Sequence, residues 1–121
     1  MVFLVLGSIG GFLSVALGAF GAHILKQSLS ADSLAVFQTG VQYQMYHALA
    51  LVLVGIFTRW TDSPWLTWSG ILFTAGIVLF SGSLYLLSMT GTKTLGAITP
   101  IGGICFLAGW AFLLIAGTKS F

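Results

Sequence analysis

Hydrogen-bonding side chains crowd one short segment of an otherwise apolar sequence. The segment GVQYQMYHALALV, residues 40–52, opens with two glutamines, two tyrosines and a histidine and continues with apolar residues only. Histidine changes charge near neutral pH, and amides and hydroxyls can bind polar ligands. The segment could therefore line a polar pocket for a lipid headgroup or small solute, with His23 or His47 as the titrating member. The alternative is a set of hydrogen bonds that join membrane helices.

The sequence holds no recognisable catalytic or metal-binding constellation. It has no HExxH, no paired carboxylates, no cysteine-based metal motif and no GxSxG. No acidic residue lies inside an apolar stretch, so the carboxylate relay of many proton-coupled transporters is absent. His23 and His47 could ligate haem only if they met at one depth, and their expected depths differ by about two turns. We therefore expect no enzyme activity, no cofactor and no metal site.

Membrane-spanning helices must position these polar side chains. Of the 121 residues, 58% are hydrophobic and 5% are charged, which is too apolar for a soluble domain. The charges leave four charge-free stretches, 1–25, 33–58, 63–92 and 94–118, and each reaches the ~20 residues that cross a bilayer. Lipid cannot satisfy backbone hydrogen-bonding groups, so each stretch must be a helix. We predict an all-α, integral membrane four-helix up-down bundle, a single transmembrane domain of residues 1–121 with spans at about 2–25, 34–58, 64–89 and 95–118.

Local signals predict three boundaries, which belong to the second and third helices. Ser30 or Asp32 is a candidate N-cap for the second helix, which we expect to begin near residue 33. Ser63 followed by Pro64 is typical of a helix start and predicts the beginning of the third helix. Gly91 suits the position just after the end of that helix.

Two starts are possible for the fourth helix, because a proline lies near its beginning. In the version that we favour, Thr94 caps the helix and Pro100 makes a kink inside its first two turns. Gly96 would then relieve crowding four residues before the proline. In the alternative, Thr99 is the cap and Pro100 the first helical residue, and residues 94–98 form an irregular start.

Small residues form a stripe along the first helix. Their spacing of four, three, four and four residues places them on one face, where another membrane helix can approach closely. We interpret the stripe as a packing surface within the bundle; the alternative is a contact between copies in a homo-oligomer. The residues are Gly7, Gly11, Ser14, Gly18 and Ala22.

The intramembrane polar residues gather toward one face of the membrane. Side A denotes the face that holds both termini and residues 58–63, and side B the face that holds residues 26–33 and 90–94. Polar residues of all four helices lie in the half next to side B, and we expect them to face the bundle interior. Gln44 lies near the boundary between the polar and apolar faces of the second helix. The candidate ligand-binding or hydrogen-bonding residues are His23, Gln42, Tyr43, Tyr46, His47, Ser81, Tyr85 and Thr99.

Five stretches together resemble one small membrane family. They are GAFGAHILK, FQTGVQYQMYHALALV, LFSGSLYLLSMTG, GAITPIGG and FLAGW. The chain resembles domain-of-unknown-function family 423, which is related to the eukaryotic transmembrane protein 256 group. The resemblance runs from Gly18 to Trp110 and implies a four-span protein of bacterial or organellar membranes, without implying an activity. Ile24 stands where a glycine is expected in many relatives. The matching motif residues are His23, Gln42, Tyr43, Gln44, His47, Ser81, Gly82, Ser83, Tyr85, Thr99 and Pro100.

Two functions from different classes follow as hypotheses. The first is a non-catalytic membrane component that packs with itself or with a larger membrane complex. The second is a lipid- or solute-binding or transport module that uses the polar pocket near side B. Basic residues occur singly, so we expect the lipid bilayer as a partner and no nucleic acid. We expect a multi-pass protein of the cell membrane with both termini in the cytoplasm, although Arg59 and Lys119 on side A balance Lys26 and Lys93 on side B.

Overall fold

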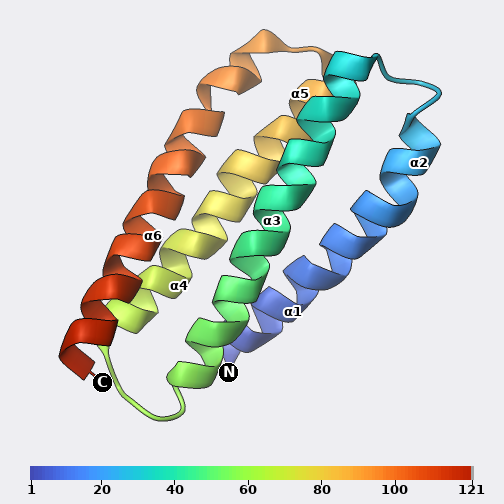
Figure 1. Ribbon diagram of the computed structural model, residues 1–121. Helices are drawn as coiled ribbons and strands as arrows, with labels where there is room; N and C mark the ends of the chain where they lie inside the picture. Colours follow the sequence, from blue (N-terminus) through green and yellow to red (C-terminus); the bar gives the residue numbers. More distant parts are fainter. Residues whose placement is uncertain (121) are drawn as a thin grey trace.

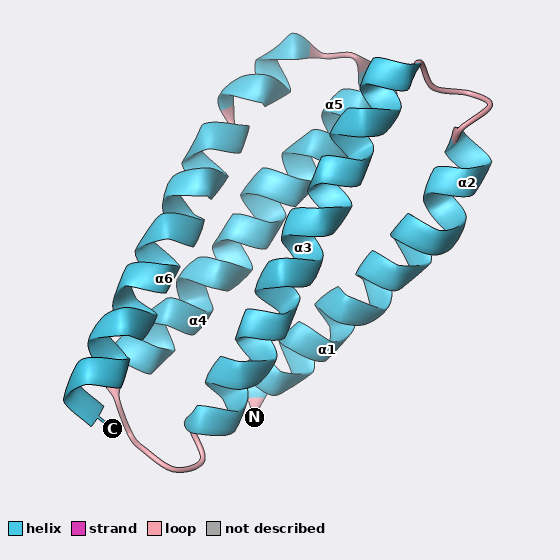
Figure 2. Cartoon of the chain, in the orientation of Figure 1, coloured by secondary structure: helices cyan, strands magenta, loops and turns pink. Residues whose placement is uncertain are grey.

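Residues 1–120 fold into four helical columns, which run alternately up and down (Figure 1). The computed structural model describes residues 1–120, so residue 121 of the predicted domain lies outside the described residues. Within residues 1–120 there is no strand (Figure 2). Each column is long and apolar enough to cross a membrane. The all-α four-helix prediction is confirmed. The columns are α1 (Val2–Val15), η1 (Ala16–Gly21) and α2 (Ala22–Leu25); α3 (Ala31–Phe57); α4 (Pro64–Gly76), η2 (Ile77–Ser81) and α5 (Gly82–Thr90); and η3 (Lys93–Ala97) and α6 (Thr99–Ser120).

Helix α3 is the central element of the bundle. It packs against α1 on one side and against the α4–η2–α5 column on the other, and that column packs in turn against α6. The N-terminus and the end of α6 lie at the same end as the connection between α3 and α4 (Figure 1). A cluster of buried apolar residues, which includes Leu51, Val54, Leu66 and Phe73, lies toward this side-A end.

Capping residues begin and end the helices as their local chemistry dictates. The Ser30 hydroxyl accepts a hydrogen bond from the Ser33 amide at 3.1 Å, so α3 begins at Ala31, two residues before the predicted start. Ser63 occupies the N-cap position of α4 beside Pro64, although its hydroxyl makes no capping bond. Gly91 ends α5 in the left-handed conformation, with φ of 70°, which glycine adopts without a side-chain clash.

The favoured start of the fourth helix is wrong. Residues Lys93–Ala97 form a 3-10 helix, and α6 begins at Thr99, so Pro100 lies in its first turn rather than at an internal kink. The Ile98 carbonyl accepts from the Ile101 amide at 3.0 Å and from the Gly102 amide at 3.2 Å, both beyond the proline. A proline has no N–H to donate and its ring clashes with the carbonyl four residues earlier, and both penalties disappear in the first turn of a helix.

The first and third columns each contain a wide π turn. The Ala22 amide donates to the Leu17 carbonyl and the Gly82 amide to the Ile77 carbonyl, five residues back instead of four. In the third column Gly76 is buried and the next buried residue is Ser81, five residues later. In a regular α-helix, a residue five positions after Gly76 would point away from the interior. The π turn absorbs the extra residue, and so Ser81 remains buried and bonds to the Gly40 carbonyl of α3.

Candidate functional site

A hydrogen-bonded relay of three residues joins three columns. The Tyr85 hydroxyl of α5 donates to the Gln44 side-chain oxygen of α3 at 2.6 Å. The Gln44 side-chain amide then donates to the Gly10 carbonyl of α1 at 2.9 Å. Gln44 is only 4% exposed, and no water is needed to complete its bonds across the relay. Because an amide carries both a donor and an acceptor, one glutamine can bridge two neighbouring helices.

His47 uses both ring nitrogens within the bundle. The Trp110 indole N–H of α6 donates to His47 Nε2 at 3.1 Å, and His47 Nδ1 lies 2.7 Å from the Tyr43 carbonyl oxygen. Indole only donates and a carbonyl only accepts, so both bonds are made when the neutral imidazole carries its proton on Nδ1. The ring also stacks on Phe106, with centroids 3.5 Å apart and planes at 9°. His47 therefore joins α3 to α6 and has no nitrogen left for a ligand.

Serine hydroxyls make the remaining bonds between columns. Ser81 donates to the Gly40 carbonyl of α3 at 2.7 Å, and Ser69 donates to the Gly109 carbonyl of α6 at 2.8 Å. Ser83 and Thr99 share a hydrogen bond at 2.6 Å between α5 and α6. Two of these bonds end on glycine carbonyls, because the absence of a side chain lets the neighbouring helix come close.

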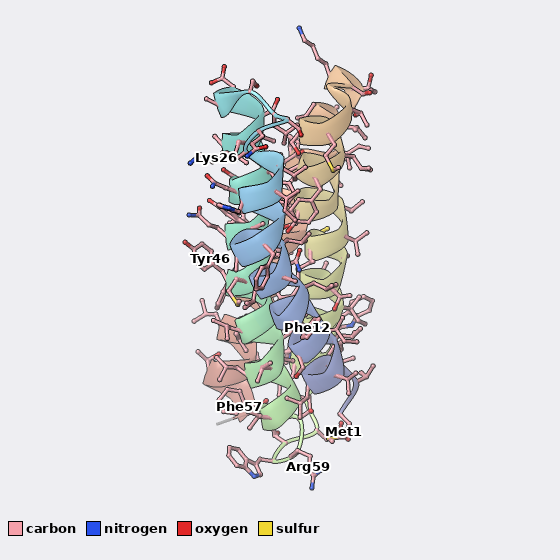
Figure 3. The ribbon with its side chains drawn as sticks, turned by 90° about the vertical axis from the view of Figure 1, so that its right-hand side faces the viewer. Met1, Phe12, Lys26, Tyr46, Phe57 and Arg59 are labelled. Atoms are coloured by element: carbon pink, nitrogen blue, oxygen red, sulfur yellow. The ribbon has the colours of Figure 1, made fainter. Side chains whose placement is uncertain are left out.

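Three of the predicted site residues lie outside this network. His23, Gln42 and Tyr46 are exposed, and Tyr46 points away from the bundle (Figure 3). The expectation that the polar residues all face the interior is wrong for these three. The interior face of α3 instead carries Gln44 together with Gly40 and Ala48, and the two small residues permit close approach.

The other predicted polar residues do reach neighbouring columns. Ser81, Tyr85 and Thr99 make the hydrogen bonds described above, and His47 meets α6. Tyr43 is 39% exposed, and its ring lies against Phe80 with centroids 4.7 Å apart.

The small-residue stripe of α1 packs inside the bundle along most of its length. A Cβ at Gly7 would lie 2.7 Å from the Ala48 carbonyl oxygen of α3, and one at Gly18 would lie 3.0 Å from a Val41 methyl. A Cβ at Gly11 would meet nothing within 4 Å. Ser14 and Ala22 are buried.

Sequence reasoning missed the residues on which the network depends most. Gln44 was placed at a facial boundary, although it lies within a motif that matches the family. Trp110 and Phe106 are not among the predicted site residues, and Gly10 lies one position away from the predicted stripe. The FLAGW motif was the available signal for Trp110, because an indole N–H within the membrane needs an acceptor that lipid chains cannot supply.

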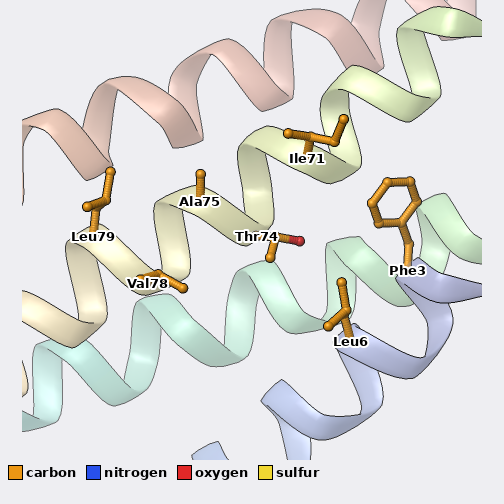
Figure 4. A pocket seen from close by; sticks show the side chains of 7 residues that line it. All are labelled: Phe3, Leu6, Ile71, Thr74, Ala75, Val78 and Leu79. Atoms are coloured by element: carbon orange, nitrogen blue, oxygen red, sulfur yellow. The ribbon is translucent and has the colours of Figure 1, made fainter.

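Apolar grooves, rather than polar pockets, open between the columns. One groove of about 410 Å³ lies between α1 and the third column (Figure 4), and its lining includes Leu6, Thr74 and Val78. These three residues also line a second groove of about 340 Å³, which reaches Gln44 and Tyr85. A third groove, the Trp110 groove, of about 440 Å³, is lined by Tyr43, His47, Phe80, Pro100, Gly103, Ile104, Phe106, Leu107 and Trp110.

No metal site is formed by the described residues. Within residues 1–120, no group of three or more His, Cys, Asp or Glu side chains could hold a metal ion. Cys105, the single cysteine, is a free thiol on α6.

A bundle of four apolar columns joined by interhelical polar bonds is characteristic of a small multi-pass membrane protein. Residues 17–103 match the profile of a family described as "Protein of unknown function (DUF423)", and the chain belongs to this family. The predicted resemblance is therefore confirmed.

Curated relatives match the chain over nearly its full length. The chain is 49% identical over 119 residues to the UPF0382 membrane protein YwdK of Bacillus subtilis, and the alignment covers 98% of this chain and 97% of the relative. It is 48% identical over 118 residues to the UPF0382 membrane protein SSP2132 of Staphylococcus saprophyticus, with 98% of each chain covered. It is 41% identical over 116 residues to the UPF0382 inner membrane protein YgdD of Escherichia coli K12, with 96% of this chain and 88% of the relative covered. No solved structure matches the chain.

Proposed function

We propose that the protein is a non-catalytic membrane component, and that its buried polar residues form a structural frame between helices. One observation carries this proposal. Among the described residues, every buried side-chain nitrogen or oxygen except Ser63 Oγ has a hydrogen-bond partner within the protein. A site for a polar ligand needs unpaired groups directed into a cavity, whereas here those groups are already bonded, either within their own helix or to a neighbouring one.

The frame is large enough to matter for the stability of a small bundle. Six side-chain hydrogen bonds join different columns. At roughly 0.6 kcal/mol each, the average measured between membrane helices, they contribute about 4 kcal/mol. The free energy of unfolding of a small domain is typically about 5–15 kcal/mol. The frame therefore accounts for the buried polar residues without a ligand.

A double-mutant cycle on the relay tests the proposal. Tyr85→Phe and Gln44→Leu, alone and combined, should reveal a coupling of about 0.6 to 1.7 kcal/mol in the free energy of unfolding, measured in mild detergent. Tyr43→Phe is the matched control, because among the described residues no hydrogen bond is made by the Tyr43 hydroxyl. It removes the same chemical group and should change stability little.

A bound polar ligand would oppose the proposal. In that case native mass spectrometry would show a small polar molecule bound one to one to the wild-type protein and absent from Gln44→Leu. If, in addition, the cycle showed no coupling, the polar residues would be a ligand site rather than a frame.

A second candidate function is the binding of a lipid acyl chain, which the Trp110 groove favours. This groove is almost wholly apolar, and Gly103 leaves open space in its wall, since a Cβ there would have its nearest neighbour at 4.0 Å. Gly103→Leu should fill the groove and reduce the lipid retained by the purified protein in native mass spectrometry. Gly117→Leu, on the same helix with nothing within 4 Å, is the control. Equal retention by the two variants would oppose this function.

A further inference from the structure

An outward face of α3 carries polar side chains in the part of the helix nearest side B. Gln38, Gln42 and Tyr46 are spaced by four residues, which places them on one stripe of the helix. All three are exposed, and the Tyr46 side chain is 56% exposed and points away from the bundle (Figure 3). Gln44, on the same helix, differs from these three residues, because it is buried and both the oxygen and the nitrogen of its side-chain amide are hydrogen-bonded.

This stripe lies at the depth of the hydrocarbon core. Helix α3 has 27 residues, which corresponds to a length of about 40 Å. Charged residues mark its two ends, Asp32 in its first turn and Arg59 just beyond its last, and Tyr46 lies about halfway between them. Gln42 lies about 6 Å nearer side B. Both side chains therefore fall within a core that is about 30 Å thick.

Within the described chain these polar groups make no hydrogen bonds. Neither the Gln38 nor the Gln42 amide has a partner in residues 1–120, and the Tyr46 hydroxyl has none, although the Tyr46 ring contacts that of Tyr43. Lipid chains offer neither donors nor acceptors, and unpaired polar groups at this depth are costly. The face therefore requires a partner that brings hydrogen-bonding groups to the middle of the membrane.

The face continues as an apolar seam toward side A. Leu49, Leu53 and Ile56 are exposed in line with Gln42 and Tyr46. From Gln42 to Ile56 the five residues are spaced four, three, four and three apart, which is the pattern of a seam between two parallel helices. The described face carries no charge that would repel a like surface. This face of α3 therefore suits pairing with another helix, and its polar residues would set the register of that pairing.

We propose that this outward face of α3 binds the same face of a second copy of the chain, with Gln42 paired to Gln42. Copies inserted in the same orientation hold each residue at equal depth, and a two-fold axis along the membrane normal brings a face onto itself. A glutamine amide and a tyrosine hydroxyl each carry a donor and an acceptor, so each can bond to its own counterpart. This dimer goes beyond the proposed structural frame, because it uses residues that take no part in the frame.

Cysteine cross-linking in native membranes tests the dimer. In a Cys105→Ser background, which removes the single native cysteine, Leu49→Cys places a thiol on the seam without changing Gln42. A membrane-permeant oxidant should then link it into a covalent dimer. Val78→Cys on η2 and Leu114→Cys on α6 are controls, because both positions are exposed, at 65% and 69%, but lie on other columns. They should cross-link far less.

Substitutions at the polar position test its assigned role. Adding Gln42→Leu to Leu49→Cys should weaken dimerisation roughly fivefold, the change expected when a hydrogen bond between membrane helices is lost. Gln42→Asn, which keeps the amide, should weaken it less than Gln42→Leu. Two differently tagged wild-type copies should co-purify in mild detergent, and the Gln42→Leu copies should do so less.

Three results would overturn the proposal. Leu49→Cys could cross-link no better than the two controls, or cross-link mainly to a different protein. Alternatively, Gln42→Leu could leave dimerisation unchanged. Each of these results leaves the internal frame untouched, because the frame is tested separately by the coupling between Tyr85 and Gln44.

Discussion

The two glycines Gly7 and Gly11 of α1 offer a sharp test of how the small-residue stripe is used. Both were predicted to line one packing surface, and the structure separates them. A Cβ at Gly7 would lie 2.7 Å from the Ala48 carbonyl oxygen and 2.8 Å from the Val52 amide nitrogen, both backbone atoms of α3. A Cβ at Gly11 would meet nothing within 4 Å. We expect Gly7→Ala to destabilise the protein and Gly11→Ala to leave it as stable as the wild type or more so.

The size of the effect follows from these distances. Ordinary Cβ contacts begin near 3.4 Å, so α1 must move away from α3 by about 0.7 Å to accommodate alanine at residue 7. The same movement would stretch the bond from Gln44 to the Gly10 carbonyl, now 2.9 Å, beyond hydrogen-bonding distance. Overpacking costs about 1–3 kcal/mol and the lost bond roughly 0.6 kcal/mol. The helix propensity gained from alanine is the same at both sites, so the two variants should differ by about 2–4 kcal/mol.

Thermal unfolding in mild detergent measures this difference. A thiol-reactive fluorogenic dye reports exposure of Cys105, which is the single cysteine and lies on α6, far along the chain from either substitution. Circular dichroism on the same samples follows the loss of helix. Equal stability of Gly7→Ala and Gly11→Ala would refute the reasoning. So would a Gly11→Ala protein that is as destabilised as Gly7→Ala, because the stripe would then contact a partner at both positions.

Three further predictions concern packing, the histidine and the membrane orientation. Gly102→Ala should destabilise the bundle by about 1–3 kcal/mol, because its Cβ would collide with the Phe80 backbone, whereas the adjacent Gly103→Ala has room and should not; the same unfolding assay compares them. His47→Leu leaves the Trp110 indole N–H without its acceptor and should cost about 1–3 kcal/mol, more than His47→Gln, which retains a hydrogen-bonding group; equal losses would contradict the role assigned to the imidazole. A reporter fused to the C-terminus should be active in the cytoplasm, and activity only on the outer face would reverse the orientation.

Local properties of the sequence determined the number of helices and most of their ends. Charge-free stretches of sufficient length must become helices in lipid, whatever their neighbours are, because the backbone has no other way to bond. Ser30 and Gly91 act on the turn in which they lie, so the end of a helix could be inferred from the residue itself. The start of α6 was the exception, since Thr94 and Thr99 offered equivalent local signals on either side of a 3-10 helix.

Only the tertiary structure decided which side of α3 faces inward. The sequence indicated a polar and an apolar face on this helix, but it could not show which edge of the polar face meets the other columns. Close approaches at Gly7, Gly10 and Gly40 and the π turn at residues 77–81 set the rotation of the helices about their axes. That rotation directs Gln44 toward the interior, where it forms the relay, and leaves Gln42 on the outer surface of the bundle. The rotation of a helix is a property of packed neighbours rather than of its own residues, and so residues two positions apart on one helix acquired opposite environments.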